Sequence, residues 1–89
     1  MLKNIEMDVD AQLKNVADNI KERRIRLHLS QSYMARALGI TQNAYSKIET
    51  AKTKMSLERL YEIAEILNVK PKQLIASNII TMHSHRKVG

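Results

Sequence analysis

Residues 31–49, QSYMARALGITQNAYSKIE, have the pattern of two short amphipathic helices separated by a turn. The apolar positions recur at helical spacing and are Met34, Ala35 and Leu38, followed by Tyr45 and Ile48. Such spacing places apolar side chains on one face of each helix. Gly39 is expected to end the first helix in the left-handed conformation, which costs least for a residue without a Cβ. The stretch therefore predicts two packed helices joined by a tight turn.

A hydroxyl residue precedes each of these helices. Ser30 and Thr41 can each accept a hydrogen bond from a free backbone amide in the first turn that follows. Two helices that meet across a short glycine-containing turn form a helix-turn-helix, the unit that lays its second helix in the major groove of DNA. The sequence thus points to double-stranded DNA as a partner.

The same stretch resembles the helix-turn-helix of the phage repressor and Cro family, the XRE-like regulators. The residues that carry the resemblance are Gln31, Ala35, Gly39, Ile48 and Glu49, and the likeness extends over about residues 16–75. It implies an all-α fold, a compact five-helix domain of the lambda-repressor-like type. It also implies a sequence-specific transcriptional regulator, a repressor, that reads operator half-sites with its third helix.

The helix over residues 42–49 carries polar side chains on the face opposite Tyr45 and Ile48. The candidate base-contacting residues are Gln42, Asn43, Ser46 and Lys47. Glutamine and asparagine bond adenine at N6 and N7, while lysine prefers guanine O6 and N7. The alternative is an ordinary solvated helix face.

Contacts with DNA phosphates are implied by the resemblance at two further places. Gln31 and Thr41 lie at helix starts, where free amides attract anions. Lys52, Thr53 and Lys54 resemble the phosphate-clamping loop of the family.

Three positions depart from the family pattern. Many relatives have Gly where Ala51 stands and Pro where Met55 stands, so a tighter or more helical loop is expected here. Tyr45 replaces a more usual Ile or Val. We expect its ring in the core and its hydroxyl at a phosphate.

A first helix is predicted over residues 11–28, with Asp10 as its N-cap. Its apolar stripe comprises Leu13, Val16, Ala17, Ile20 and Leu27. Arg24 falls on the same stripe, and a buried cation needs a partner. In the family an arginine at this position pairs with a glutamate at the position of Glu49, which implies a structural ion pair. Alternatively, Arg24 extends to solvent or contacts a phosphate.

A fourth and a fifth helix complete the predicted domain. Ser56 caps the fourth, Asn68 ends it, and Pro71 opens the fifth, where its missing N–H costs least. The apolar residues expected in the core are Leu57, Leu60, Ile63, Ala64, Leu67, Leu74 and Ile75. We therefore divide the chain into an N-terminal extension (1–12), the helix-turn-helix domain (13–76) and a C-terminal tail (77–89).

Composition agrees with one small helical domain. The 89 residues include three tyrosines as the only aromatics and no cysteine, so aliphatic side chains must build the core without disulfides. The net charge is +6. Residues 14–54 hold nine basic and three acidic residues, which accounts for all of it. This distribution suits a polyanionic partner, although a merely solubilising charged face is the alternative.

Several classes of function are disfavoured. No apolar run is long enough for a membrane span, and the acidic N-terminus is unlike a signal peptide, so we expect a cytoplasmic protein. No cofactor is expected. His83 and His85 lack supporting ligands, so no metal site is predicted. The chain has no pattern of a catalytic nucleophile or a phosphate-binding glycine loop, so an enzyme is not expected.

Three functional hypotheses stay open. The first is a regulator that binds as a homodimer to half-sites roughly 34 Å apart. The second is the antitoxin of a toxin–antitoxin pair that autoregulates its operon and binds a toxin or other regulatory protein. The third is a protein-interaction module that never contacts DNA. Ile79 and Ile80 in the tail are expected to cover the domain or to join a dimer contact.

Overall fold

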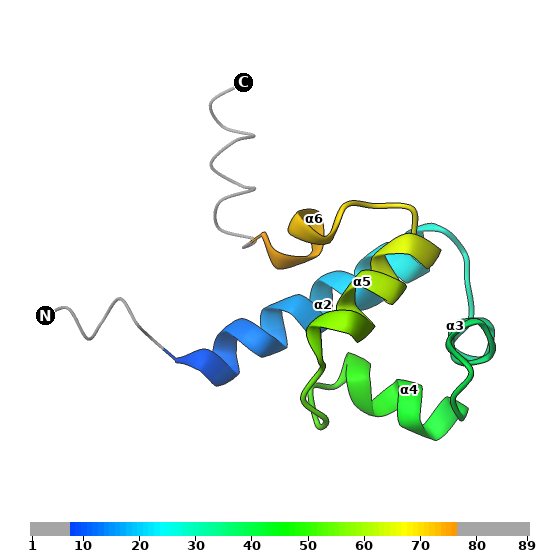
Figure 1. Cartoon of the computed structure of the whole chain (residues 1–89), viewed down its shortest axis with the longest axis horizontal. Helices are drawn as coiled ribbons and strands as arrows, with labels where there is room; N and C mark the ends of the chain where they lie inside the picture. Colours follow the sequence, from blue (N-terminus) through cyan, green and yellow to red (C-terminus); the bar gives the residue numbers. More distant parts are fainter. Residues whose placement is uncertain (1–7, 77–89) are drawn as a thin grey trace, which may run out of the picture.

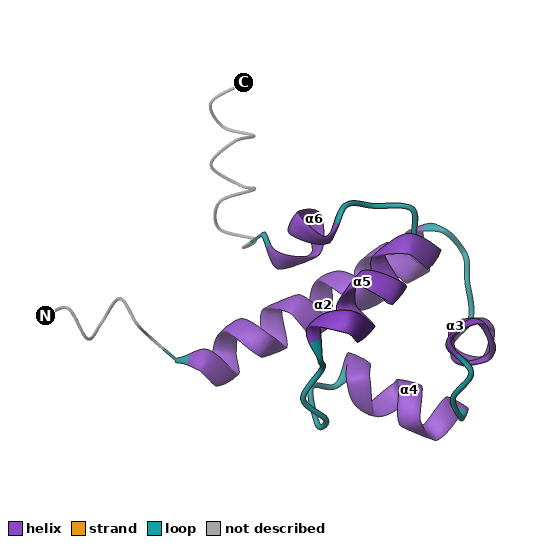
Figure 2. Cartoon of the chain, in the orientation of Figure 1, coloured by secondary structure: helices purple, strands orange, loops and turns teal. Residues whose placement is uncertain are grey.

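The computed structural model describes residues 8–76, and this part of the chain contains helices and no strand (Figure 2). The helices are α2 (Val9–Arg26), α3 (Gln31–Leu38), α4 (Gln42–Glu49), α5 (Leu57–Ile66) and α6 (Pro71–Ile75). Over residues 8–76, the predicted all-α fold of five helices is confirmed. Within the described residues, no helix is both long enough and apolar enough to cross a membrane.

The helices pack around one small core. In Figure 1, α2 and α5 lie one in front of the other, α6 lies above them, and α4 forms the lower edge between α3 and the loop that leads to α5. Helix α3 packs against α4 and α5, and α2 packs against α4 and α6. The largest fully buried side chains are Tyr45, Ile20, Met34, Ile63 and Leu67. Both helices of the helix-turn-helix therefore bury their predicted apolar faces.

Hydroxyl side chains cap three helix N-termini as predicted. The Ser30 hydroxyl accepts from Tyr33 N (2.9 Å), that of Thr41 from Ala44 N (3.0 Å), and that of Ser56 from Arg59 N (3.0 Å). Each cap satisfies an amide that has no partner inside its own helix.

Helix α2 starts and ends two residues earlier than predicted. It begins at Val9, inside the predicted extension, and its N-cap is Asp8, which makes no side-chain cap bond. The assignment of Asp10 as the cap was wrong, because Asp10 already lies in the first helical turn.

Four helices end in the same way, with one residue in the left-handed conformation. These residues are His28 (φ 59°), Gly39 (φ 73°), Ala51 (φ 60°) and Asn68 (φ 57°). In each case that residue's amide and the next amide turn back to carbonyls of the last turn, the Schellman arrangement. The predictions for Gly39 and Asn68 are confirmed. Helix α2, predicted to reach His28, ends at Arg26.

Two residues predicted for the core are exposed instead. Leu57 is 64% exposed, because it is the first residue of α5 and lies on the same side as the exposed Tyr61. Ile75 is 52% exposed. It follows the buried Leu74, and neighbouring residues of a helix point about 100° apart. The predictions for Ile79, Ile80, His83 and His85 fall outside the described residues.

Candidate nucleic-acid interface

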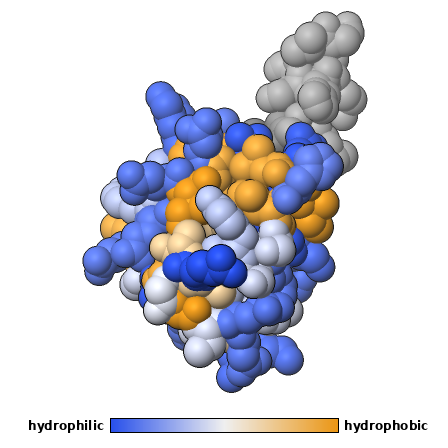
Figure 3. All heavy atoms as spheres, turned by 90° about the vertical axis from the view of Figure 1, so that its right-hand side faces the viewer, coloured by the Kyte–Doolittle hydropathy of each residue, from blue (hydrophilic) through white to orange (hydrophobic). Residues whose placement is uncertain are grey.

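The outer face of α4 is polar and accessible. Gln42, Asn43 and Lys47 are exposed and Ser46 is half-buried, while Tyr45 and Ile48 on the opposite face are 0% and 6% exposed. Figure 3 views the molecule from the α3 side and shows hydrophilic residues at the bottom of this face, at the height of α4. The four predicted base-contacting residues therefore lie together on one helix, with no core role for the three exposed ones.

The carboxylate of Glu49, the last residue of α4, lies at the centre of a buried polar network. Glu49 is 3% exposed. Arg24 Nε donates to Glu49 Oε2 (2.6 Å) and Arg24 Nη2 to Oε1 (3.1 Å), so the ion pair is bidentate. Arg24 Nη1 donates to the carbonyl oxygen of Leu29 (2.8 Å). The structure thus brings together the two residues expected to pair, and the pair joins α2 to α4.

Two further donors complete the network. Tyr45 Oη donates to Glu49 Oε2 (2.5 Å), and Gln31 Nε2 donates to Glu49 Oε1 (3.1 Å). Each carboxylate oxygen therefore accepts two hydrogen bonds. A buried charge is tolerated when its hydrogen-bonding capacity is filled in this way. Helices α2, α3 and α4 consequently meet at one carboxylate.

The network shifts the pKa values of its members. Burial alone would raise the pKa of Glu49, but the hydrogen bonds from Arg24, Tyr45 and Gln31 together hold it below its ordinary value. The hydrogen bond to Glu49 raises the pKa of Arg24. Burial, reinforced by the bond to Glu49, raises the pKa of Tyr45 well above its ordinary value. At neutral pH the carboxylate is therefore charged and the phenol keeps its proton.

This arrangement corrects the interpretation of Tyr45. Its ring lies in the core as expected, but its hydroxyl points to Glu49 inside the domain and does not reach a phosphate. The spacing of Tyr45 and Glu49, four residues apart on one helix, was a signal that could have predicted the bond.

The two phosphate candidates at helix starts are held by contacts within the domain. One N–H of the Gln31 amide is donated to Glu49, which fixes the side chain and leaves the second N–H for another acceptor. The Thr41 hydroxyl accepts the Ala44 amide, so its own O–H is available. Both groups are therefore oriented before any ligand arrives.

The loop from α4 to α5 presents Lys52, Thr53 and Lys54, all of which are exposed. A tighter or more helical loop was expected, and of these two forms the helical one is not found, because Ala51 adopts the left-handed conformation that ends α4. The amide of Lys52 then donates to the carbonyl oxygen of Lys47 (2.9 Å) and closes the turn.

Lys52 differs from the residues at the same position in the other three helix ends. There the residue after the left-handed one is Leu29, Ile40 or Val69, each packed against the core. A hydrophobic contact at this position commonly supports the motif. Lys52 gives no such support, so the loop presents a cation where a core contact is usual.

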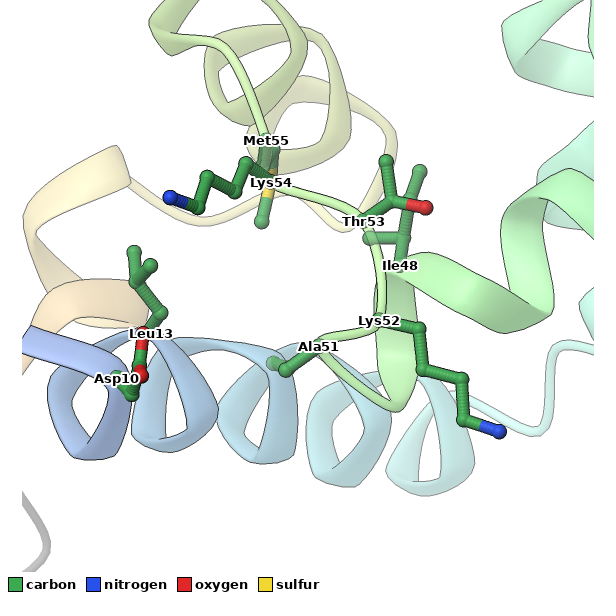
Figure 4. Close-up of a pocket in the computed structure, with 9 residues that line it drawn as sticks. Asp10, Leu13, Ile48, Ala51, Lys52, Thr53, Lys54 and Met55 are labelled. Atoms are coloured by element: carbon green, nitrogen blue, oxygen red, sulfur yellow. The ribbon is translucent and has the colours of Figure 1, made fainter.

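A cavity of about 140 Å³ lies between this loop and the start of α2. Figure 4 shows Met55 reaching into the cavity from the loop while Lys52 points away from it. Leu13 and Ala51 line other sides of the cavity. The side of the loop that faces α2 is therefore not fully packed, and the Lys52 side chain points away from that side.

A second hollow, an open groove of about 480 Å³, runs along α4 towards the start of α5. Its basic lining residues are Lys47, Lys54 and Arg59, and no acidic residue lines it. Sequence reasoning missed Arg59. The signal was its position, three residues after the cap Ser56, which places it in the first turn of α5.

Metal-ligating groups do not gather in the described part of the chain. Between residues 8 and 76, no three side chains of His, Cys, Asp or Glu are grouped so that they could hold a metal ion.

Comparison with known proteins agrees with this geometry. The helix-turn-helix family model matches residues 20–74, which is more than half of the chain. An uncharacterized transcriptional regulator in the ATPase CF(0) region of Rhodospirillum rubrum is 34% identical over 55 residues. The match covers 62% of this chain and 51% of that protein, so the chain spans about half the length of the relative. No solved structure matches the chain.

Proposed function

The chain belongs to the helix-turn-helix family, as an XRE-type protein, and on that premise we propose that it is a repressor that binds specific double-stranded DNA operators. Members of this family are DNA-binding regulators and are in general not enzymes. The observation that carries the proposal is the exposed face of α4, formed by Gln42, Asn43, Ser46 and Lys47. Side chains of these types read base edges in the major groove. Repression follows when the bound protein occupies the site that RNA polymerase needs.

The buried network supports this proposal because it fixes the reading helix. Glu49 ties the end of α4 to Arg24 of α2 and to Gln31 of α3. A helix that is already held rigidly before binding loses less conformational entropy when its side chains contact the bases. We assign Arg24 and Glu49 a structural role on this ground.

Phosphate contacts would set the register of α4 on the duplex. Gln31 and Thr41 contribute N–H and O–H donors, while Lys52, Thr53 and Lys54 contribute the loop donors. Among these we favour Lys52, because it is exposed at a position where the other helix ends place a partly buried apolar residue.

The short reading helix favours a homodimer. Helix α4 has eight residues, so it is about 12 Å long and spans about four base pairs. Four base pairs recur too often in a genome to define an operator. Two copies on an inverted repeat, with half-sites roughly 34 Å apart, would double the sequence that is read. Such a regulator would act in the cytoplasm, where it meets DNA.

Selection of bound duplexes from a random DNA library, repeated at two salt concentrations, tests the proposal. We expect an inverted repeat that persists at the higher salt concentration, because base contacts survive where purely electrostatic binding is lost. Recovery of no consensus, with all binding lost as salt rises, would refute sequence-specific recognition. The antitoxin and protein-interaction hypotheses would then lead, and a protein partner would be sought.

A further inference from the structure

The groove between α4 and the start of α5 has the chemistry of a site for a sugar–phosphate strand. Its lining combines apolar side chains with basic ones. The apolar lining residues are Ile40, Ala44, Ile48 and Met55, and the basic ones are Lys47, Lys54 and Arg59. The neutral polar lining residues are Asn43, Thr53 and Ser56. The carbon atoms of a deoxyribose ring can pack on the apolar side chains, while the phosphates on either side of it can accept hydrogen bonds from the basic ones.

Arg59 is held in place at the groove by a neighbour on its own helix. Arg59 Nη1 donates to Glu62 Oε1 (2.9 Å), and the two side chains are 30% and 45% exposed. A partly exposed pair of this kind contributes little to stability. It does limit the rotamers of the guanidinium. Because it uses only one N–H group of Arg59, the other N–H groups can donate to another acceptor. The pairing therefore orients Arg59 without using up its donors.

The groove is continuous with the face of α4 that carries the base-contacting candidates. Asn43 and Lys47 belong to both surfaces. A helix seated in the major groove lies between two sugar–phosphate strands, so a strand must pass beside it. Gln31 does not line the groove, so a phosphate held there is different from the one assigned to Gln31.

We infer that this groove holds one DNA strand beside the reading helix, and that Arg59 donates to a phosphate of that strand. The inference rests on the proposed function and extends it to a residue outside the helix-turn-helix and its loop. Because the contact is to the backbone, it adds affinity equally to operator and to unrelated sequence. A free nucleotide offers the same chemistry, but the open groove has no closed wall that would enclose one.

The test measures binding to a selected operator duplex and to a scrambled duplex of equal length over a series of KCl concentrations. Three proteins are compared: the unchanged chain, Arg59→Gln and Arg26→Gln. Arg26 is the matched control, because it lies on α2 outside the groove and pairs with Glu22 one turn away (3.4 Å). Arg59→Lys is a fourth protein that keeps the charge.

We expect Arg59→Gln to weaken both duplexes by the same factor and to reduce the slope of log K against log[salt] by about 0.9, the value for one lost phosphate contact. Arg26→Gln and Arg59→Lys should keep the slope. Equal slopes for Arg59→Gln and Arg26→Gln, with both proteins folded, would overturn the inference. So would saturable binding of deoxyadenosine monophosphate that Arg59→Gln abolishes while the DNA slope is unchanged. Absence of DNA binding by the unchanged chain would instead refute the proposed function.

Discussion

Gln31 Nε2 donates a hydrogen bond to Glu49 Oε1 over 3.1 Å, and this bond joins the first residue of α3 to the last residue of α4. The same carboxylate receives Arg24 from α2. The side chain of Gln31, which we propose as a phosphate contact, is thus oriented by the carboxylate of the ion pair that joins α2 to α4. Under the proposed phosphate contact of Gln31, a change at Glu49 should alter both the stability of the domain and its affinity for DNA.

Gln31→Ala should weaken DNA binding at least about tenfold without changing its salt dependence, because one hydrogen bond to a charged phosphate contributes about 1.5–3 kcal/mol. The amide is neutral, so its contact with the phosphate releases no counterion. Lys52→Ala should weaken binding and also reduce the salt slope by about 0.9. Titration of both variants into a labelled duplex at several salt concentrations measures this. A change of slope with Gln31→Ala would contradict the assigned contact.

Tyr45→Phe should destabilise the domain by about 1.5–3 kcal/mol, the usual contribution of a hydrogen bond to a charged group. The ring stays in the core, so no cavity forms, but Glu49 Oε2 loses one of its donors. Urea unfolding measures the change. The control is Tyr61→Phe, because Tyr61 is 55% exposed and should respond by less than about 0.5 kcal/mol. Equal effects of the two substitutions would mean that the buried hydroxyl contributes nothing.

Acid should unfold the protein through Glu49. The folded-state pKa of this carboxyl lies below its ordinary value of 4.5, so its stabilising contribution is fully present above that value. The contribution is lost as the pH falls from 4.5 through the lower folded value. Free energies of unfolding between pH 7 and pH 2 measure this loss.

Glu22→Gln is the control for the acid profile, because its ion pair with Arg26 is 60–70% exposed and contributes little. It should leave the fall unchanged. Glu49→Gln should make the free energy of unfolding depend less on pH in this range. It should also lower that free energy at neutral pH by about 3–5 kcal/mol, because Arg24 is left unpaired. If Glu49→Gln does not fold, Tyr45→Phe should move the fall to higher pH. If Glu22→Gln removed the loss of stability at low pH while Glu49→Gln kept it, the assignment to Glu49 would be contradicted.

Ala51→Gly should stabilise the protein, and Gly39→Ala should destabilise it, each by about 1 kcal/mol. Both positions have the left-handed conformation, which penalises a Cβ. No atom lies within 4 Å of a Cβ built at Gly39, so the cost there is conformational alone. Thermal unfolding of the two variants measures both effects. Changes of the same sign would show that backbone strain does not determine stability at these positions.

The helix starts and the reading face could be predicted from sequence because local chemistry determines them. A hydroxyl at Ser30, Thr41 or Ser56 caps whichever helix follows, and the period of apolar residues separates inner from outer faces. The left-handed conformation of His28 and Ala51 was not predicted, since neither residue is a glycine or an asparagine, the residues that usually end a helix in this way. The groove at Arg59 was also missed, because it forms only where α4 and α5 meet in space.

The central claim is that α4 reads bases, and the ratio of affinities for the selected duplex and a scrambled duplex tests it most directly. This ratio is measured at 0.15 M salt, about physiological ionic strength, for the unchanged chain and for the double variant Gln42→Ala, Asn43→Ala. Each lost bidentate contact costs about 1–3 kcal/mol of discrimination, so the ratio should fall at least tenfold while binding to the scrambled duplex changes little. An unchanged ratio in a folded double variant would contradict the account.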